Sequence, residues 1–400
     1  MKKFVIGILC FLLLQNILIA QISPQLRTTI DSMAGEHLKS TGGIGFVVAV
    51  YNKGEKDLLY YGITFPGGRD RADSSSVFEI GPITEAFTAI AFSDMASKGM
   101  IGFDDPLQKY LPVDVPSPVY QKIVCAPMKD PENPYGVGQE QGRKFTPYVC
   151  LPDVSEKPQP ILLCYLATHT SGLPAFPHNL KSIKGKNDPY ATYSRKDLYD
   201  FLKNYRLLEP IGYDYLNSPL GISILGHVLS LHEKKSYEEV IEGHLLHSLG
   251  MTQTKITLGD PLKYHMLNGY NSTGKQEPNW HYDIFAPSGA FHSTPADMLR
   301  FLEANIASTK TPMSDILDYT HNPRVRLNDH KTGLQEIALG WKISPLGIEQ
   351  QRIVWQGGST GGFASYIGFV ETSHTGVVIL SNCSVPVDDF GKKILQMMNR

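Results

Sequence analysis

The stretch from Val77 to Pro112 constrains the fold of this chain more than any other. It starts with residues suited to a short strand, Val77–Ile80, and a turn residue, Gly81. A helix is predicted from Pro82, because proline lacks the N–H that has no partner at a first helical position and already has a helical φ. Gly99 is a suitable stop for this helix. Residues at helical spacing predict one apolar face: Ile83, Phe87, Ile90 and Ala91.

The same stretch resembles the nucleophile helix of the serine β-lactamase and penicillin-binding-protein superfamily. The most similar branch is the class C β-lactamase-like group, which includes D-Ala-D-Ala carboxypeptidases and esterases. That branch reads roughly F-x-I-G-S-x-T-K-x-F-T-A, followed by G-x-I-x-L-D-D-P-x-x-K-Y-L-P. The nucleophilic serine falls on Pro82 and the lysine that takes its proton falls on Glu85. The supporting residues are therefore present, whereas the two chemical ones are replaced.

Further segments resemble the same family in the same order, so that the resemblance covers about residues 40–389. These segments are Ile161–Pro174, with its H-T-S-G-L-P block, Tyr215-Leu216-Asn217, Tyr237–Thr254, Ala286–Arg300 and Trp355–Phe363. In the family His169 belongs to the scaffold, and we interpret it here as scaffold rather than as a catalytic base.

The resemblance implies a role for each position that matches a family motif. In the family the tyrosine of Y-x-N aids proton transfer and the asparagine contacts the substrate amide. These residues survive as Tyr215 and Asn217, although Tyr215 could also be a helix-capping aromatic. Gln356 sits where the third motif, K-T-G or H-x-G, has its cation. Tyr215 is thus the surviving catalytic residue, and the implied ligand-binding residues are Asn217, Gln356, Gly358, Ser359 and Thr360.

The replacements bear directly on acyl transfer, in which a serine attacks a carbonyl and backbone donors hold the developing oxyanion. Pro82 has neither a hydroxyl nor an N–H, so it removes the nucleophile and one of the two oxyanion donors. Loss of one such donor typically costs about 10²–10³ in rate. Glu85 inverts the charge of the lysine position, and Gln356 removes a further positive charge. The three changes all predict weakened acylation.

Three functions follow from this pattern. The first is an exported, catalytically impaired relative that binds a peptide-like or cell-wall-derived ligand, or a protein partner, in the old site. The strand around Gly358–Thr360 would act as an edge strand that pairs with an extended peptide. The second is a working hydrolase (carboxypeptidase, β-lactamase or esterase) with a non-standard site. The third is a structural or regulatory interaction protein whose cleft is occluded, for instance by the segment at residues 113–160.

The resemblance implies an α/β (α+β) fold, in which helices flank an antiparallel sheet built from both ends of the chain. The sheet subdomain would comprise about residues 21–103 and 283–400. A mostly helical subdomain would be inserted at about residues 104–282. Residues 113–160 are rich in proline and show little periodicity, so we expect an irregular insertion near the mouth of the site.

Residues 1–20 are expected to be a signal peptide. Lys2 and Lys3 precede an apolar run, Phe4 to Leu14, and a weak cleavage site follows Ala20. An uncleaved membrane anchor is the alternative. No second run of about 20 apolar residues follows, so we expect the mature protein, residues 21–400, to be periplasmic or secreted and to have no membrane span.

Charge and cysteine usage limit the partners of the chain. The net charge of −2 over 400 residues favours no nucleic-acid partner. No Cys/His spacing suggests zinc, so neither a metal nor a cofactor is expected. An exported chain can form disulfides, and Cys125 and Cys150 are the favoured pair because they bracket a Pro/Gly-rich segment. Cys164 and Cys383 are either paired or buried free thiols.

Overall fold

The computed structural model of the chain describes residues 22–127, 138–140, 143–145, 148–181, 188–212, 214–306, 310–327, 336–348 and 350–400. The expected signal peptide at residues 1–20 lies outside the described residues. None of the described helices is both long and apolar enough to span a bilayer.

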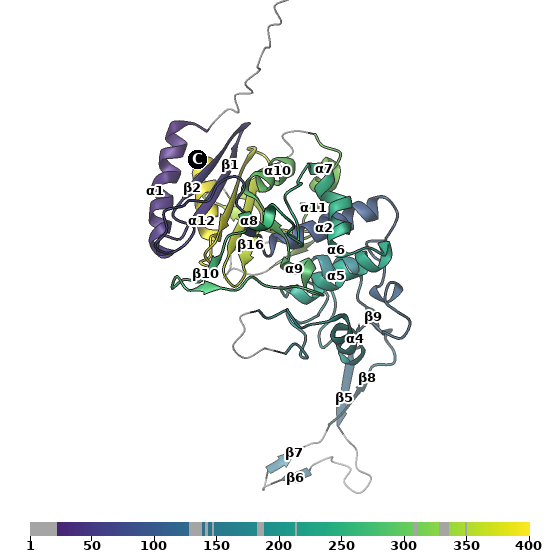
Figure 1. Ribbon diagram of the computed structural model, residues 1–400. Coiled ribbons are helices and arrows are strands. Elements are labelled where there is room, and N and C mark those ends of the chain that lie inside the picture. The colour runs from purple at the N-terminus through teal and green to yellow at the C-terminus, as the bar shows by residue number, and fades with distance from the viewer. Residues whose placement is uncertain are drawn as a thin grey trace, which may run out of the picture.

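An eight-stranded antiparallel sheet forms the framework (Figure 1). Its strand order is β13-β14-β15-β16-β17-β18-β1-β2, which brings strands from both ends of the chain together and confirms the predicted fold. The strands are β1 (Phe46–Asn52), β2 (Glu55–Tyr61), β13 (Val325–Arg326), β14 (Glu336–Ile337), β15 (Lys342–Leu346), β16 (Gln351–Ser359), β17 (Ala364–Val370) and β18 (Thr375–Ser381). The central strands β17 and β18 are buried along their whole length, as expected for strands that are covered on both faces.

Helices cover both faces of the sheet, and the alternation of side chains along β1 shows how. Phe46, Val48 and Val50 enter the core that α1 (Pro24–Ser40) and α12 (Asp388–Met398) share with the sheet. The residues between them, Val47 and Ala49, enter the larger core of α2 (Ile83–Ser97) and α10 (Pro295–Asn305). Because side chains alternate between faces with a period of two, one strand serves both cores.

Helix α2 is the central element of the larger core. Every residue from Ile83 to Met95 is buried, so the predicted single apolar face is wrong: the helix packs against β16 and β17 on one side and against other helices around the rest. Its buried polar residues have hydrogen-bond partners, either within the helix, as Ser93 Oγ does by donating to the Ala89 carbonyl at 2.8 Å, or outside it, as Thr88 Oγ1 does by donating to the Pro287 carbonyl at 3.0 Å. The helix begins at Ile83, and Pro82 is the residue that precedes it.

The remaining helices lie mostly between residues 104 and 320. They are η1 (Leu107–Lys109), α3 (Leu163–Ala167), α4 (Arg195–Asn204), α5 (Pro219–Glu233), α6 (Tyr237–Ile241), the π-helix η2 (Glu242–Leu246), α7 (His247–Leu249), α8 (Leu262–His265), α9 (Ala286–Gly289) and α11 (Ser314–Thr320). Two-residue strands accompany them: β3 (Phe78–Glu79) with β12 (His292–Ser293), and β10 (Gly269–Tyr270) with β11 (Gln276–Glu277). One apolar core runs through this region and the sheet, so the division into two subdomains stays a prediction.

The described parts of the segment at residues 113–160 contain short paired strands, which were not predicted. These are β4 (Val119–Tyr120) with β9 (Gln159–Pro160), β5 (Ile123–Pro127) with β8 (Tyr148–Pro152), and β6 (Gly138–Glu140) with β7 (Arg143–Phe145). Strands β5 and β8 form an arm that projects from the body of the molecule (Figure 1). Neighbouring residues such as Ile123 and Val124 are both exposed. Neither face of the arm is buried, so the sequence lacks the alternation that would have revealed strands.

The favoured disulfide is confirmed. Cys125 and Cys150 lie directly opposite each other in β5 and β8 and are bonded. Cys164, which is half-buried, and Cys383, which is buried, are free thiols.

Candidate functional site

Pro82, which the sequence analysis aligned with the family's nucleophile, stands at the junction of β3 and α2. Gly81 precedes it with φ +46°, a left-handed conformation that glycine adopts without strain. The ring of Pro82 packs on β16: a Cβ built on Gly358 would lie 2.7 Å from Pro82 Cγ. The proline ring thus occupies the space between α2 and the strand, and only glycine fits opposite it.

Alternate residues of β16 and the turn after it face α2. Gln356 reaches Glu85, Gly358 meets Pro82, and Thr360 Cγ2 would lie 3.2 Å from a Cβ on Gly81. Ser359 belongs to the opposite face and is exposed, and its hydroxyl donates to the Ser384 carbonyl at 3.4 Å. Of the predicted ligand-binding residues in this strand, Ser359 therefore has its side chain directed away from Pro82 and Glu85.

Strand β16 is also not an edge strand, since β13 and β2 form the two sheet edges. Its pairing with β15 ends at the pair Lys342–Trp355, whereas its pairing with β17 continues to Ser359. Residues 356–359 are thus paired on one side only. The predicted edge is limited to these four residues.

Glu85 is buried at 3% exposure and is held by the side chain of Gln356. Nε2 of Gln356 donates to Glu85 Oε2 and to the carbonyl of Gly340, each at 3.1 Å, and its Oε1 accepts the N–H of Gly357 at 3.0 Å. The Gln356 amide is therefore fully used inside the chain. Gly340 can approach because it has no side chain: a Cβ there would lie 2.9 Å from the Glu85 carbonyl oxygen.

His169 is the residue whose position the sequence analysis underestimated. It has φ +55°, and its Nδ1 accepts the backbone N–H of Ser218 at 3.0 Å, which is the predicted scaffold role. Because that N–H can only donate, the proton of the neutral ring resides on Nε2. Nε2 lies 3.5 Å from Glu85 Oε2, so the ring also presents a donor to the carboxylate. The sequence held one signal for this second role: a buried carboxylate at position 85 requires a hydrogen-bond donor nearby.

Tyr215 lies beside this group. Its ring meets the ring of His169 edge to face, with centroids 5.9 Å apart. Burial and, secondarily, the charge of Glu85 raise the pKa of the Tyr215 phenol above its usual value, so the phenol stays protonated and is a poor base at neutral pH. Asn217 follows on the exposed surface, just before Ser218 caps α5. The structure thus brings Tyr215 to Glu85 and places Asn217 at the outer side.

Lys342 was missed by the sequence analysis. It lies on β15 opposite Trp355, with its Nζ 4.9 Å from the Trp355 ring centroid. Burial lowers the pKa of Lys342, while the charges of Glu85 and Asp388 act to raise it. Glu85 and Lys342 thus interact electrostatically across β16, although no pattern in the sequence links them.

Glu79, the last residue of β3, is a second buried acidic residue and lies beside Thr360. Burial raises the pKa of Glu79 to about 7, against the lowering effect of the Trp280 N–H, which donates to Oε1 at 3.2 Å. Thr360 is close enough to lower this pKa, but its hydroxyl lies outside hydrogen-bond geometry with Glu79. Nδ1 of His281 lies 2.7 Å from Asp188 Oδ2. The charge of His281 also acts to lower the pKa of Glu79.

Aromatic rings line the same region. Tyr190 stacks on Tyr282 and Phe285, with centroids 5.2 and 4.7 Å apart. Burial and the charge of Glu85 raise the pKa of Tyr190 to about 12. This group of rings therefore lies within electrostatic reach of Glu85.

One group of possible metal ligands occurs among the described residues: Asp318, His321 and Glu371. Nδ1 of His321 lies 2.9 Å from Glu371 Oε1, and Nε2 lies 2.9 Å from Asn305 Oδ1. Both ring nitrogens already have partners in the chain, so the donor set does not fit a metal ion.

Comparisons with known proteins agree with the motifs. A family model described as Beta-lactamase matches residues 30–398. The Beta-lactamase of Pseudomonas fluorescens is 22% identical over 397 residues, covering 91% of this chain and 95% of that protein. The D-alanyl-D-alanine-carboxypeptidase/endopeptidase AmpH of Escherichia coli (strain K12) is 21% identical and covers 94% of this chain and 89% of its own length.

Solved structures show the same fold. The crystal structure of Beta-lactamase/D-alanine Carboxypeptidase from Yersinia pestis complexed with citrate superposes with a TM-score of 0.73. The two chains are 21% identical, and the match covers 94% of this chain and 99% of that one. A structure described as a class C beta-lactamase gives a TM-score of 0.72 at 20% identity.

Proposed function

This chain belongs to the beta-lactamase family, and we propose that it is an exported member with impaired acylation that binds a peptide-like or cell-wall-derived ligand at the former active site. The observation that carries the proposal is the mutual fit of the replacements. The Pro82 ring packs against Gly358, and the Glu85 carboxylate accepts a hydrogen bond from Gln356. Neither position carries the reactive group of the family, and each side chain contacts a residue of β16.

The chemistry supports impairment for separate reasons. Pro82 offers no hydroxyl for attack and no N–H for an oxyanion. Glu85, buried one helical turn on, places a hydrogen-bond acceptor where an acyl-transfer site needs positive charge. Among the described residues, the groups beside the protonated Tyr215 are already engaged: His169 Nδ1 accepts the Ser218 N–H, and Glu85 accepts a hydrogen bond from Gln356.

Ligand binding is supported by the groups that remain available. Residues 356–359 are paired with β17 alone, so an extended peptide could add its backbone on the other side. Asn217 is exposed, and its amide can both donate and accept. Figure 1 shows the described arm of β5 and β8 projecting from the body, so these strands do not supply the occlusion that a purely structural role would need.

The first experiment measures covalent acylation. The mature protein, residues 21–400, is incubated with a fluorescent penicillin and with an ester substrate, beside the variant Pro82→Ser/Glu85→Lys/Gln356→His. The third change is needed because Nε2 of Gln356 would otherwise point a donor at the new lysine. We expect no label and no turnover in the natural protein, and labelling in the variant. Label or turnover in the natural protein would refute impairment and favour a working hydrolase with a non-standard site.

The second experiment tests the ligand. An acetylated peptide ending in D-Ala-D-Ala is titrated into the natural protein, into Asn217→Ala, and into the control Ser359→Ala, whose side chain lies on the other face of β16. We expect binding that Asn217→Ala weakens and Ser359→Ala preserves. Equal affinity in all three proteins would show that the peptide does not bind at this site. Export is tested separately by determining the first residue of the secreted protein. Cleavage after Ala20 would leave Gln21 at that position.

A further inference from the structure

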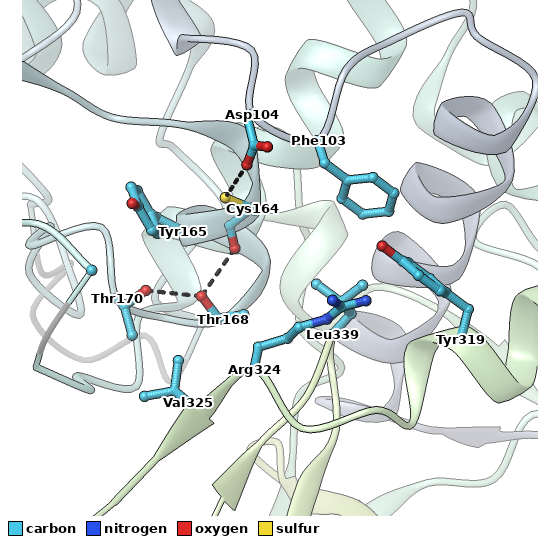
Figure 2. A pocket seen from close by; sticks show the side chains of 11 residues that line it. Phe103, Asp104, Cys164, Tyr165, Thr168, Thr170, Tyr319, Arg324, Val325 and Leu339 are labelled. Atoms are coloured by element: carbon cyan, nitrogen blue, oxygen red, sulfur yellow. Dashed lines mark hydrogen bonds between the residues drawn. The ribbon is translucent and has the colours of Figure 1, made fainter.

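A separate cavity lies behind the turn that carries His169. It has a volume of about 280 Å³ and opens between α3, α11 and β13. Phe103, Cys164 and Tyr319 are among its walls, and Asp104 and Arg324 stand at its sides (Figure 2). None of Pro82, Glu85, Tyr215 and Gln356 lines it, so it is distinct from the site discussed above.

Two opposite charges open into this cavity without a charged partner. The Arg324 guanidinium lies over the Tyr319 ring, 4.4 Å from its centroid, and within the described residues it makes neither an ion pair nor a hydrogen bond. In the part of the chain that the structure describes, the Asp104 carboxylate meets only the thiol of Cys164, whose Sγ donates to Oδ1 at 3.5 Å. Unpaired surface charges are common singly, but here a cation and an anion face one aromatic-walled cavity.

The threonines at the back of the cavity add acceptors. Thr168 Oγ1 donates to the carbonyl of Cys164 at 2.9 Å and lies 2.8 Å from Thr170 Oγ1. Since the Thr168 proton is used for the carbonyl, the proton between the two hydroxyls belongs to Thr170. Thr170 Oγ1 therefore presents lone pairs and no proton to the cavity. The cavity thus offers acceptors at Asp104 and Thr170 and donors at Arg324.

We propose that this cavity binds a free amino acid or dipeptide as its zwitterion. The ligand carboxylate would pair with the Arg324 guanidinium, which can bind it through two parallel hydrogen bonds. The ammonium would be accepted by Asp104 and Thr170, and an apolar side chain would pack on Phe103 and Tyr319. The volume suits a ligand of this size, because it lies near the lower end of the range for small-molecule sites. The proposal does not depend on the function proposed for the former active site.

The test is calorimetric titration of phenylalanine, leucine and the dipeptide Ala-Phe into the mature protein. Each probe carries both charges, so at least one should bind saturably. Two analogues of phenylalanine separate the charges: phenylalanine amide lacks the carboxylate and N-acetylphenylalanine lacks the ammonium. We expect each analogue to bind about tenfold or more weakly, the effect of losing one charged hydrogen bond.

Variants then assign each charge to its residue. Arg324→Gln should weaken phenylalanine about tenfold but leave the amide unchanged, and Asp104→Asn should weaken phenylalanine but leave the N-acetyl form unchanged. The matched control is Arg326→Gln, a nearby exposed arginine that pairs with Glu336 and does not line the cavity; it should bind as the natural protein does. If no zwitterion binds saturably, or if Arg324→Gln binds phenylalanine with unchanged affinity, the proposal is wrong. Neither result would bear on acylation at Pro82.

Discussion

The two sides of the turn at residues 167–170 differ in how their charges are compensated. On one side, Glu85 is buried and meets Gln356 and His169. On the other, Asp104 and Arg324 are exposed and lack charged partners among the described residues. The turn itself is shared, because Thr168 and Thr170, which line the cavity, flank His169 in the chain.

This difference in burial indicates which charges of the protein a ligand can reach. A buried charge must be paired inside the chain, because a bare one costs several kcal/mol. An exposed charge is solvated and can exchange water for a ligand at little cost. The Glu85 carboxylate is therefore stabilised by internal contacts, whereas the cavity behind the turn keeps its charges available.

Gln356→Leu should have the largest effect. It removes a donor from buried Glu85 and leaves the Gly340 carbonyl and the Gly357 N–H without their side-chain partner. We expect a loss of about 4 kcal/mol in the free energy of unfolding, measured by urea denaturation. Ser359→Ala, on the opposite face of β16, should change it by less than about 0.5 kcal/mol. Similar losses in both variants would contradict the internal compensation of Glu85.

Glu79 should make stability depend on pH. Burial raises its folded-state pKa from the ordinary 4.5 to about 7, so between these values the folded protein holds a proton that the unfolded chain has released. Stability therefore falls as pH rises through this interval, by up to about 3 kcal/mol. Glu79→Gln should remove that fall. The measurement is the free energy of unfolding of both proteins from about pH 4 to about pH 8, a range that brackets the two pKa values. Parallel curves for the two proteins would mean that folding does not shift the pKa of Glu79.

Gly358→Ala tests the contact with the proline ring. The new methyl group would lie 2.7 Å from Pro82 Cγ, and such overpacking should cost about 2 kcal/mol. In the Pro82→Ser background the ring is absent, so the same substitution should cost much less. A double-mutant cycle measures the difference; additive effects would show that the ring and Gly358 do not oppose each other.

Arg324→Gln and Asp104→Asn should have the smallest effects on stability. Neither side chain has a charged partner to lose among the described residues, so each should change the unfolding free energy by less than about 0.5 kcal/mol in the absence of a ligand. Thermal unfolding measures this. A loss comparable to that of Gln356→Leu would place the two residues in the structural framework and erase the contrast between the two sides of the turn.

Much of the fold was predictable because its signals are local. The short strand predicted at Val77–Ile80 and the helix predicted between Pro82 and Gly99 match β3 at Phe78–Glu79 and α2 at Ile83–Ser97 closely. The arm at residues 113–160 was not predictable in this way, since its exposed strands bury no face. The complete burial of α2 was also missed, because the pattern Ile83–Phe87–Ile90 does not reveal what packs against the opposite side.

The site was predictable as a set of positions but not as a set of contacts. The motifs located Pro82, Glu85, Tyr215 and Gln356, and the structure brings Glu85, Tyr215 and Gln356 together with His169. The direction of the Ser359 hydroxyl and the second role of His169 were missed. Both depend on how a strand or turn is rotated against its neighbours, which residue types alone do not specify.

The sequence alone was enough to predict the family's fold and to align Pro82 and Glu85 with the family's serine and lysine, because motif residues at fixed spacing are local features. Which partners these two side chains have follows only from the tertiary structure. Glu85 and Gln356 are 271 positions apart, and their hydrogen bond exists only because α2 packs against β16. The same packing separates a compensated carboxylate from the open charges of Asp104 and Arg324, since burial sets the cost of leaving a charge unpaired.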